Sequence, residues 1–308
     1  MISAHRAHRL ALRVHQQVRL YSSINPFKTQ EEYNKDFREA KSLVTESQIE
    51  QFHNDGAIKL SGVFSQKHLD SIAEGVEQNL KNPSSDADHI LDGQSNTKFF
   101  GDYGNWHRLD GIREFVFKSN AAAIASTILR TKNVNFYHEH VLVKQPNADK
   151  PTPFHHDFPY YPLNGYDMLS LWIPLDYVPK DTGVQYVKGS HKWNKLFIPK
   201  NFSTYEDYQS YKSSEQYESV PQKEIEEGKY ELLYWEMNPG DVIVFHARTI
   251  HGSPGNKHNQ NRRALATRWL GEDIRFTLKK TEIPPQNTYD LKEGEKFHGE
   301  MFPSFKFE

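Results

Sequence analysis

The sequence predicts a mainly β fold, an antiparallel barrel or jelly roll that follows a set of supporting helices. From Asn133 onward, short segments rich in β-branched and aromatic residues succeed one another, and Pro, Gly, Asn and Asp residues separate them. Segments with helical periodicity come before them. Aromatic residues make up 13% of the 308 residues, and such side chains suit the half-buried surfaces of sheets.

The first helix is expected from about Thr45 to Asp55. Thr45 and Gln48 have the spacing of a capping box, and Gly56 is expected to end the helix. The apolar run that follows, residues 57–63, predicts a strand.

A second, amphipathic helix is expected over residues 65–79, because apolar side chains recur there at helical spacing. Residues 82–104 are rich in Asp, Ser, Asn and Gly, which predicts a loop. Ser119 is then expected to cap a third helix that ends near Arg130.

The β-rich part of the chain is expected to form strands over residues 133–144, 153–158, 168–175, 183–189, 230–237, 241–247 and 263–270. Residues 191–228 interrupt this pattern with many Tyr, Ser, Glu and Lys residues. We expect them to form an insertion that covers one mouth of the barrel. Residues 31–308 then form a single domain, since no second core is needed.

Residues 1–30 differ in composition from the rest of the chain. They contain no acid, and their basic residues, apart from histidine, are Arg6, Arg9, Arg13, Arg19 and Lys28. On a helix an apolar stripe lies beside the arginines, which is the composition of a mitochondrial transit peptide. The sequence therefore predicts import into the mitochondrial matrix. The alternative is a disordered basic arm on a protein that stays in the cytoplasm.

The overall composition excludes several kinds of site. Cys is 0, so disulfides, thiolate metal sites and cysteine nucleophiles are ruled out, and any metal must be held by His, Asp or Glu. The net charge of -2 argues against a nucleic-acid partner. No apolar run approaches the roughly 20 residues that a membrane helix needs.

The segment PFHHDFPYY contains the first candidate metal ligands. In a strand, His155 and Asp157 share one face and His156 points to the other. The spacing alone is weak evidence, because His-x-Asp also occurs at 53–55 and 68–70, in helical sequence where the two side chains cannot converge. An exposed salt link is the alternative for His155 and Asp157.

The segment VIVFHARTIHGSPGN contains the candidate third ligand. Either His246 or His251 can complete the site, and His251 is preferred because it stands at a strand end before GSPG. His246 lies in an apolar run, where a core histidine is the alternative. Two histidines and one carboxylate leave open positions on a metal, as in the facial triad of non-haem Fe(II) oxygenases. Zinc with an open water position is the rival.

Arg262 favours the iron interpretation. It lies eleven residues past His251, at the start of another strand. Its planar guanidinium suits the far carboxylate of a dicarboxylic keto acid, and Ser253 can add a hydroxyl donor. Taken alone, Arg262 and Arg263 are better explained as a pair of surface charges.

Three blocks of sequence resemble the phytanoyl-CoA dioxygenase family: HHD at 155–157, GDVIVFHARTIHGSPGN at 240–256 and RRALATRW at 262–269. They occur in the family's order, and the resemblance covers roughly residues 46–271. It implies a double-stranded β-helix, which is a cupin-like jelly roll, together with Fe(II), 2-oxoglutarate as cosubstrate and O2.

The resemblance also implies roles for single residues. The iron ligands would be His155, Asp157 and His251. Arg262 would bind 2-oxoglutarate with help from Ser253, and Lys144 and Trp172 fall near positions that can line the cosubstrate pocket. The alternatives are a solvated strand end for Lys144 and ordinary core for Trp172.

The implied activity is hydroxylation of a small or medium organic metabolite, with release of succinate and CO2. Related halogenases lack the carboxylate that Asp157 supplies, so hydroxylation is favoured over halogenation. A zinc hydrolase with the same triad and a non-catalytic binding protein are the alternatives. Candidates for the substrate pocket, each of which also has a structural explanation, are His156, Phe158, Tyr160, Tyr161, His246 and Arg248.

Overall fold

The computed structural model describes residues 28–91, 98–202, 204–212, 215–279, 281 and 290–308. Its helices are α2 Gln30–Leu43, α3 Glu46–Asp55, α4 Gln66–Lys81, α5 Asp110–Lys118, α6 Ala121–Ile128, α7 Gln209–Lys212 and α8 Gln222–Glu226. None of these helices is long and apolar enough to cross a membrane. The predicted transit segment falls almost entirely outside the described residues.

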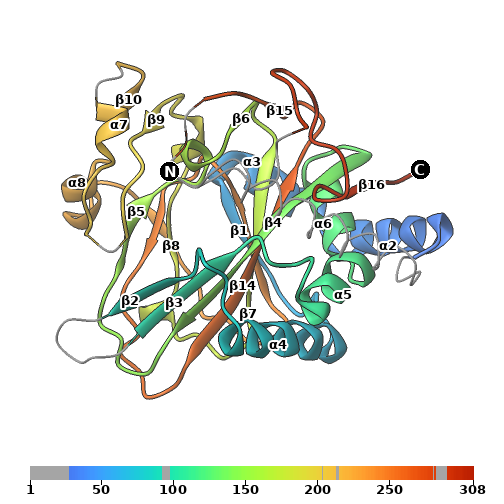
Figure 1. Ribbon diagram of the computed structural model, residues 1–308, viewed down its shortest axis with the longest axis horizontal. Helices are drawn as coiled ribbons and strands as arrows, with labels where there is room; N and C mark the ends of the chain where they lie inside the picture. Colours follow the sequence, from blue (N-terminus) through green and yellow to red (C-terminus); the bar gives the residue numbers. More distant parts are fainter. Residues whose placement is uncertain (1–27, 92–97, 203, 213–214, 280, 282–289) are drawn as a thin grey trace.

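Two antiparallel sheets form the centre of the molecule (Figure 1). The major sheet has the order β1-β12-β7-β14-β4-β3-β2, with β16 also paired to β4, and the minor sheet has the order β11-β8-β13-β5. The major strands are β1 Ala57–Leu60, β2 Asp88–Leu91, β3 Lys98–Tyr103, β4 Asn133–Lys144, β7 Met168–Pro174, β12 Val242–His246, β14 Arg262–Leu270 and β16 Ser304–Lys306. The minor strands are β5 Thr152–His155, β8 Gln185–Val187, β11 Leu232–Leu233 and β13 His251–Ser253. This arrangement confirms the predicted jelly roll.

The two faces of the major sheet pack against different partners. Leu265, Trp269 and Val141 belong to a buried cluster that they share with the helices. Figure 1 shows α2, α5 and α6 on one side of the sheets and α7 and α8 on the other. Because side chains alternate along a strand, Ala264 and Ala266 face the opposite way, into the space between the two sheets. That space contains the candidate site.

The turn from α3 into β1 forms as predicted. Thr45 and Gln48 make a reciprocal capping box, and Gly56 ends α3 in the left-handed region with φ +85°. The Gly56 carbonyl then accepts hydrogen bonds from the His246 N–H at 2.9 Å and the Thr249 hydroxyl at 2.8 Å. The glycine therefore connects the first strand to the segment that leads to His251.

The prediction of a loop over residues 82–104 is wrong in part, because β2 and β3 extend the major sheet there. Strand β3 was not predicted because the segment is polar. Its Asp102 is fully buried, and its carboxylate accepts hydrogen bonds from Asn79, Ser84 and Asn105. A buried acid that is satisfied in this way costs little, so a polar sequence can form a buried strand.

The helical prediction needs two further corrections. Helices α2 and α5 are additional to those expected from the sequence. Ser119 follows the last turn of α5 as its C-cap, and Asn120 is the residue before α6. The Ser119 hydroxyl accepts the Ala121 N–H, at 3.2 Å.

Residues 191–228 contain β9 Leu196–Phe197 and β10 Tyr217–Glu218, which pair in parallel, together with α7 and α8. Phe197, Val220 and Ile225 pack against Phe154 and Ile250 of the minor sheet region. A further small sheet pairs β6 Leu163–Asn164 with β15 Arg275–Phe276. The assignment of residues 31–308 to one domain stays a prediction.

Candidate metal centre

The pairing of β13 with β5 brings the two candidate histidines together. His251 lies directly opposite His155 in the antiparallel register. The strand ends at His155, so the expectation that His155 and Asp157 share one face of a strand is wrong. Asp157 has φ −70° and ψ −33° and precedes a single 3-10 turn at Phe158–Tyr160. This turn returns the carboxylate toward the histidines.

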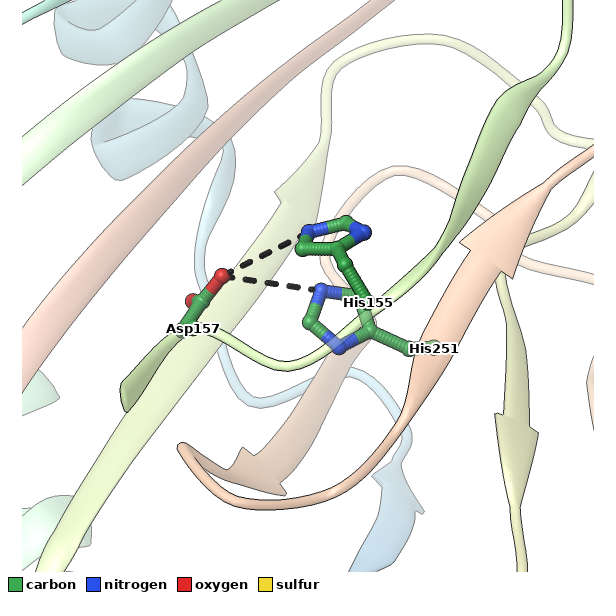
Figure 2. Close-up of side chains that lie close together, drawn as sticks. All are labelled: His155, Asp157 and His251. Atoms are coloured by element: carbon green, nitrogen blue, oxygen red, sulfur yellow. Dashed lines mark ion pairs between the residues drawn. The ribbon is translucent and has the colours of Figure 1, made fainter. Parts of the chain in front are cut away.

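Asp157 points between the two imidazole rings (Figure 2). Its Oδ1 lies 3.6 Å from Nε2 of His155 and 3.8 Å from Nε2 of His251. One ligand atom from each of the three residues lies within 4.8 Å of the others, and all three side chains are buried. Among the described residues this is the one group of three or more His, Asp or Glu side chains with such convergence.

Hydrogen bonds to main-chain carbonyls fix both rings. Nδ1 of His155 donates to the Pro153 carbonyl at 2.8 Å, and Nδ1 of His251 donates to the Thr249 carbonyl at 2.9 Å. A carbonyl only accepts, so each Nδ1 carries a proton, and in a neutral ring Nε2 then keeps its lone pair. Burial and the neighbouring His155 also lower the pKa of His251 to about 3, which keeps this ring neutral.

Arg268 occupies the other side of the Asp157 carboxylate. Its Nε and Nη2 lie 3.3 and 3.2 Å from Oδ2, while Oδ1 faces the histidines. Burial opposes ionisation of Asp157, but the charge of Arg268 holds its pKa well below the usual value. The carboxylate is therefore ionised and orients one oxygen toward a metal.

The donor set fits iron. Two imidazole nitrogens and one carboxylate oxygen converge, and no thiolate is present in the chain. Such a set leaves positions for further ligands, as the facial triad of non-haem Fe(II) oxygenases does. The triad also lines a cavity between the two sheets, so those positions are open to small molecules.

A second cluster of buried polar residues lies at the start of β14. Arg262 donates to the Thr182 carbonyl, and its Nη2 lies 3.3 Å from the Ser253 hydroxyl. Lys144, directly opposite Arg262 in the sheet, donates to the same hydroxyl at 3.1 Å. Lys144 is 1% exposed, so it is not a solvated strand end. Arg262 and Ser253 line the cavity, whereas Lys144 is not among its lining residues and contacts Ser253. The charge of Arg262 makes this end of the cavity suited to a carboxylate.

Burial acts on the charges of this cluster. It lowers the pKa of Arg262 to about 10, and the guanidinium stays charged at neutral pH. The pKa of Lys144 falls well below its usual value through burial and the nearby charge of Arg262. An anion bound between them would reverse both effects, because an opposite charge favours the protonated amine and guanidinium.

The cavity joins the triad to the Arg262 cluster. Its other walls are mainly aromatic and apolar. The residues that line it are Phe99, His140, Leu142, Thr152, His155, Asp157, Tyr160, Tyr161, Trp172, Val184, Tyr186, Phe202, Phe245, His251, Gly252, Ser253, Arg262, Ala266 and Arg268. Trp172 is thus both a core residue and a wall of the cavity.

The predicted substrate residues divide into two groups. Tyr160 and Tyr161 line the cavity. The others are directed elsewhere: Nε2 of His156 accepts the Phe197 N–H at 2.9 Å, and Arg248 lies over the Phe158 ring at 4.1 Å and donates to the Gly165 carbonyl. None of these is among the residues that line the cavity.

His246 also lies away from the site. Residues 242–256 contain two strands, β12 in the major sheet and β13 in the minor sheet. His246 ends β12, where it is buried between the rings of Tyr166 and His191. The choice of His251 for the triad therefore agrees with the geometry.

Arg268 and His140 are cavity residues that the sequence reasoning missed. Arg268 shares the inward face of β14 with Arg262, at an even spacing that strand alternation predicts. His140 faces Ala266 across the register, and its ring lies over Gly101, where a Cβ would stand 3.1 Å from Nε2. The His140 ring fits there because Gly101 has no side chain.

Comparisons with known proteins agree with this geometry. The family model of phytanoyl-CoA dioxygenase (PhyH) matches residues 52–264. The peroxisomal phytanoyl-CoA dioxygenase of Homo sapiens is 24% identical over 149 residues, 47% of this chain and 41% of that protein. The 1-deoxypentalenic acid 11-beta-hydroxylase of Streptomyces arenae is 30% identical over 155 residues, 49% of this chain and 46% of that protein.

The fold is shared with a solved structure of the epimerase SnoN in complex with Fe3+, alpha ketoglutarate and nogalamycin RO. The two have a TM-score of 0.65 at 18% identity, over 87% of this chain and 98% of that chain. The chain spans less than half the length of the human and Streptomyces relatives it matches. The family model, by contrast, covers more than half of this chain, including the HHD block, the second histidine and Arg262. The chain belongs to the phytanoyl-CoA dioxygenase family.

Proposed function

We propose that the protein is an Fe(II)- and 2-oxoglutarate-dependent dioxygenase that hydroxylates a small or medium organic metabolite, with release of succinate and CO2. The observation that carries this proposal is the position of two sites in one cavity: the triad His155, Asp157 and His251, and the cluster around Arg262. A metal ligand set next to a buried cationic pocket suits a keto acid that binds the metal at one end and a guanidinium at the other.

The side chains have separate roles in this proposal. His155, Asp157 and His251 hold the iron, and Arg262 binds the distal carboxylate of 2-oxoglutarate with the Ser253 hydroxyl and Lys144. Trp172, Tyr186 and Phe245 wall the cavity and exclude water. The bound iron with 2-oxoglutarate and O2 supplies the oxidising chemistry, and the protein supplies orientation and a dry pocket.

The intact triad supports hydroxylation, because Asp157 fills the coordination position that a halogenase leaves to halide. The aromatic walls support a substrate with an apolar body. The basic residues 1–30 support import into the mitochondrial matrix, whereas the human relative is named as peroxisomal. Localisation of a tagged full chain, with and without residues 1–30, tests this part of the proposal.

Succinate formation tests the proposed activity. The protein is incubated with 2-oxoglutarate, O2 and ascorbate, with either Fe(II) or Zn(II), and succinate is quantified. We expect slow, uncoupled succinate formation with Fe(II) and none with Zn(II). His155→Ala should abolish it, whereas His258→Ala, at a partly exposed histidine paired with Asp181, should not. Turnover that is equal in all four cases would favour a non-catalytic protein with a contaminating activity.

A further inference from the structure

Among the described residues that line the cavity there are two arginines but one acid, Asp157. Arg262 and Arg268 lie six residues apart on β14, which is about 20 Å along a strand. The inward residues between them are Ala264 and Ala266, whose small side chains leave space. If 2-oxoglutarate occupies the Arg262 end, as the proposed function requires, the Arg268 end remains for the primary substrate.

The charges of the loaded site do not balance without a further anion. The two charges of Fe(II) and the one of Arg262 offset the Asp157 carboxylate and the two carboxylates of 2-oxoglutarate. Arg268 therefore leaves one positive charge in excess, and a protonated Lys144 would increase the excess. An uncompensated charge in a buried site is costly, so a counter-ion is favoured there.

The other buried acids do not supply that counter-ion. Asp241 pairs with Lys59 at 2.8 Å, and Asp102 lies among its own hydrogen-bond donors. Glu139 has an electrostatic effect on the pKa of Arg268. Its side chain lies on the opposite face of β4 from His140, where Oε1 accepts the Asn105 N–H at 2.6 Å. Burial raises the pKa of Glu139 to about 8, so it is mostly uncharged at pH 7.

Arg268 also has an unused donor. It is 5% exposed, its Nε and Nη2 contact Asp157, and its Nη1 finds no acceptor among the described residues. The phenols of Tyr160, Tyr161 and Tyr186 around the cavity remain protonated, because burial raises their pKa values well above the usual range. They offer hydroxyl groups and add no negative charge.

We propose that Arg268 binds an anionic group of the primary substrate, so that the enzyme acts on an organic acid whose apolar body lies against the aromatic walls. This inference rests on the proposed function and deepens it. A carboxylate is the group that a guanidinium recognises through its planar array of donors. The corresponding neutral amide would leave the charge of Arg268 uncompensated and should bind more weakly.

The test compares matched acids and amides. The anaerobic complex with Fe(II) and 2-oxoglutarate is titrated with acetate, hexanoate, octanoate and phenylacetate and with their primary amides, and the change in its visible charge-transfer band is followed. We expect at least one acid to perturb the band with an affinity roughly 10-fold or more above that of its amide. Equal responses, or no response to any acid, overturn the proposal. Formation of the band itself reports on the proposed function independently.

Variants of two neighbouring arginines assign the effect. At saturating iron, Arg268→Gln should remove the preference for the acid, whereas Arg268→Lys should retain part of it. Arg263→Gln is the matched control, because Arg263 faces the other side of β14 and pairs with Asp176 at 2.8 Å. An acid preference that is unchanged in Arg268→Gln, or lost equally in Arg263→Gln, also overturns the proposal. The comparison of acids with amides in the native protein tests the proposal even if one variant fails to fold.

Discussion

Arg268 and Asp157 form a buried ion pair in which the guanidinium contacts Oδ2 and leaves Oδ1 directed at the two histidines. The contact distances are 3.2 Å for Nη2 and 3.3 Å for Nε. An ionised carboxylate that is held on one side presents a single oxygen to a metal, because its second oxygen is already engaged.

This relationship predicts that Arg268→Lys weakens iron binding. Lysine keeps the charge but cannot place two donors on Oδ2, so Asp157 gains freedom to rotate. We expect the dissociation constant for Fe(II), measured by anaerobic titration, to rise roughly 10-fold. Arg263→Lys on the same strand is the control, and an equal rise in both variants would show that the effect is not transmitted through Asp157.

Arg262→Gln should raise the requirement for 2-oxoglutarate. The substitution keeps a hydrogen-bond donor but removes the charge and the planar fork that contacts Ser253. We expect KM for 2-oxoglutarate to rise about 10-fold to 100-fold, measured by succinate formation over a range of cosubstrate concentrations. An unchanged KM would place the distal carboxylate elsewhere.

The raised pKa of the buried Glu139 should make the free energy of unfolding depend on pH. Its pKa is raised from 4.5 to about 8 by burial, so the folded state binds a proton that the unfolded state releases. This contribution to stability is fully present below pH about 4.5 and is lost as the pH rises through about 8, with a slope of at most about 1.4 kcal/mol per pH unit. The free energy of unfolding of Glu139→Gln, measured with urea between pH 5 and pH 9, should lack this slope. A parallel pH profile in the variant and the native chain would contradict the assignment.

Alanine substitutions at two glycines distinguish the cost of backbone strain from the cost of a steric clash. Gly56 and Gly62 both have positive φ, +85° and +64°, but a Cβ at Gly56 would lie 2.5 Å from His191 Nδ1 and from Thr249 Oγ1, and a Cβ at Gly62 would meet nothing within 4 Å. We expect Gly62→Ala to lower the free energy of unfolding by about 1 kcal/mol and Gly56→Ala by at least about 2 kcal/mol. Equal losses in denaturant unfolding would mean that the contacts around Gly56 relax freely.

Local chemistry explains which elements the sequence predicted. Thr45, Gln48 and Gly56 mark the ends of α3 through hydrogen bonds and backbone preferences that act over a few residues. Strand β4 coincides with the predicted segment because its β-branched and aromatic residues favour a strand locally. Strand β3 was missed because the burial of Asp102 depends on donors from Asn79 and Asn105, which lie outside the strand.

The site shows the same limit. The ligands His155, Asp157 and His251 could be named because the residue types and their spacing match a known pattern. The pairing of Arg268 with Asp157 could not, since it depends on the turn after His155 and on contact between segments 111 residues apart. His246 and Arg248 were expected to line the substrate pocket, but neither lies in the cavity. The chain turns between β12 and β13, and Arg248 there donates to the Gly165 carbonyl.

The central claim is that one iron is bound by His155, Asp157 and His251 beside a keto acid held by Arg262. Its most direct test is anaerobic addition of Fe(II) and 2-oxoglutarate, with the visible absorbance and the bound iron measured together. We predict one iron per chain and a charge-transfer band that requires both additions and is absent from Asp157→Ala. A band of equal intensity in Asp157→Ala, or iron bound without any band in the native chain, would contradict the account.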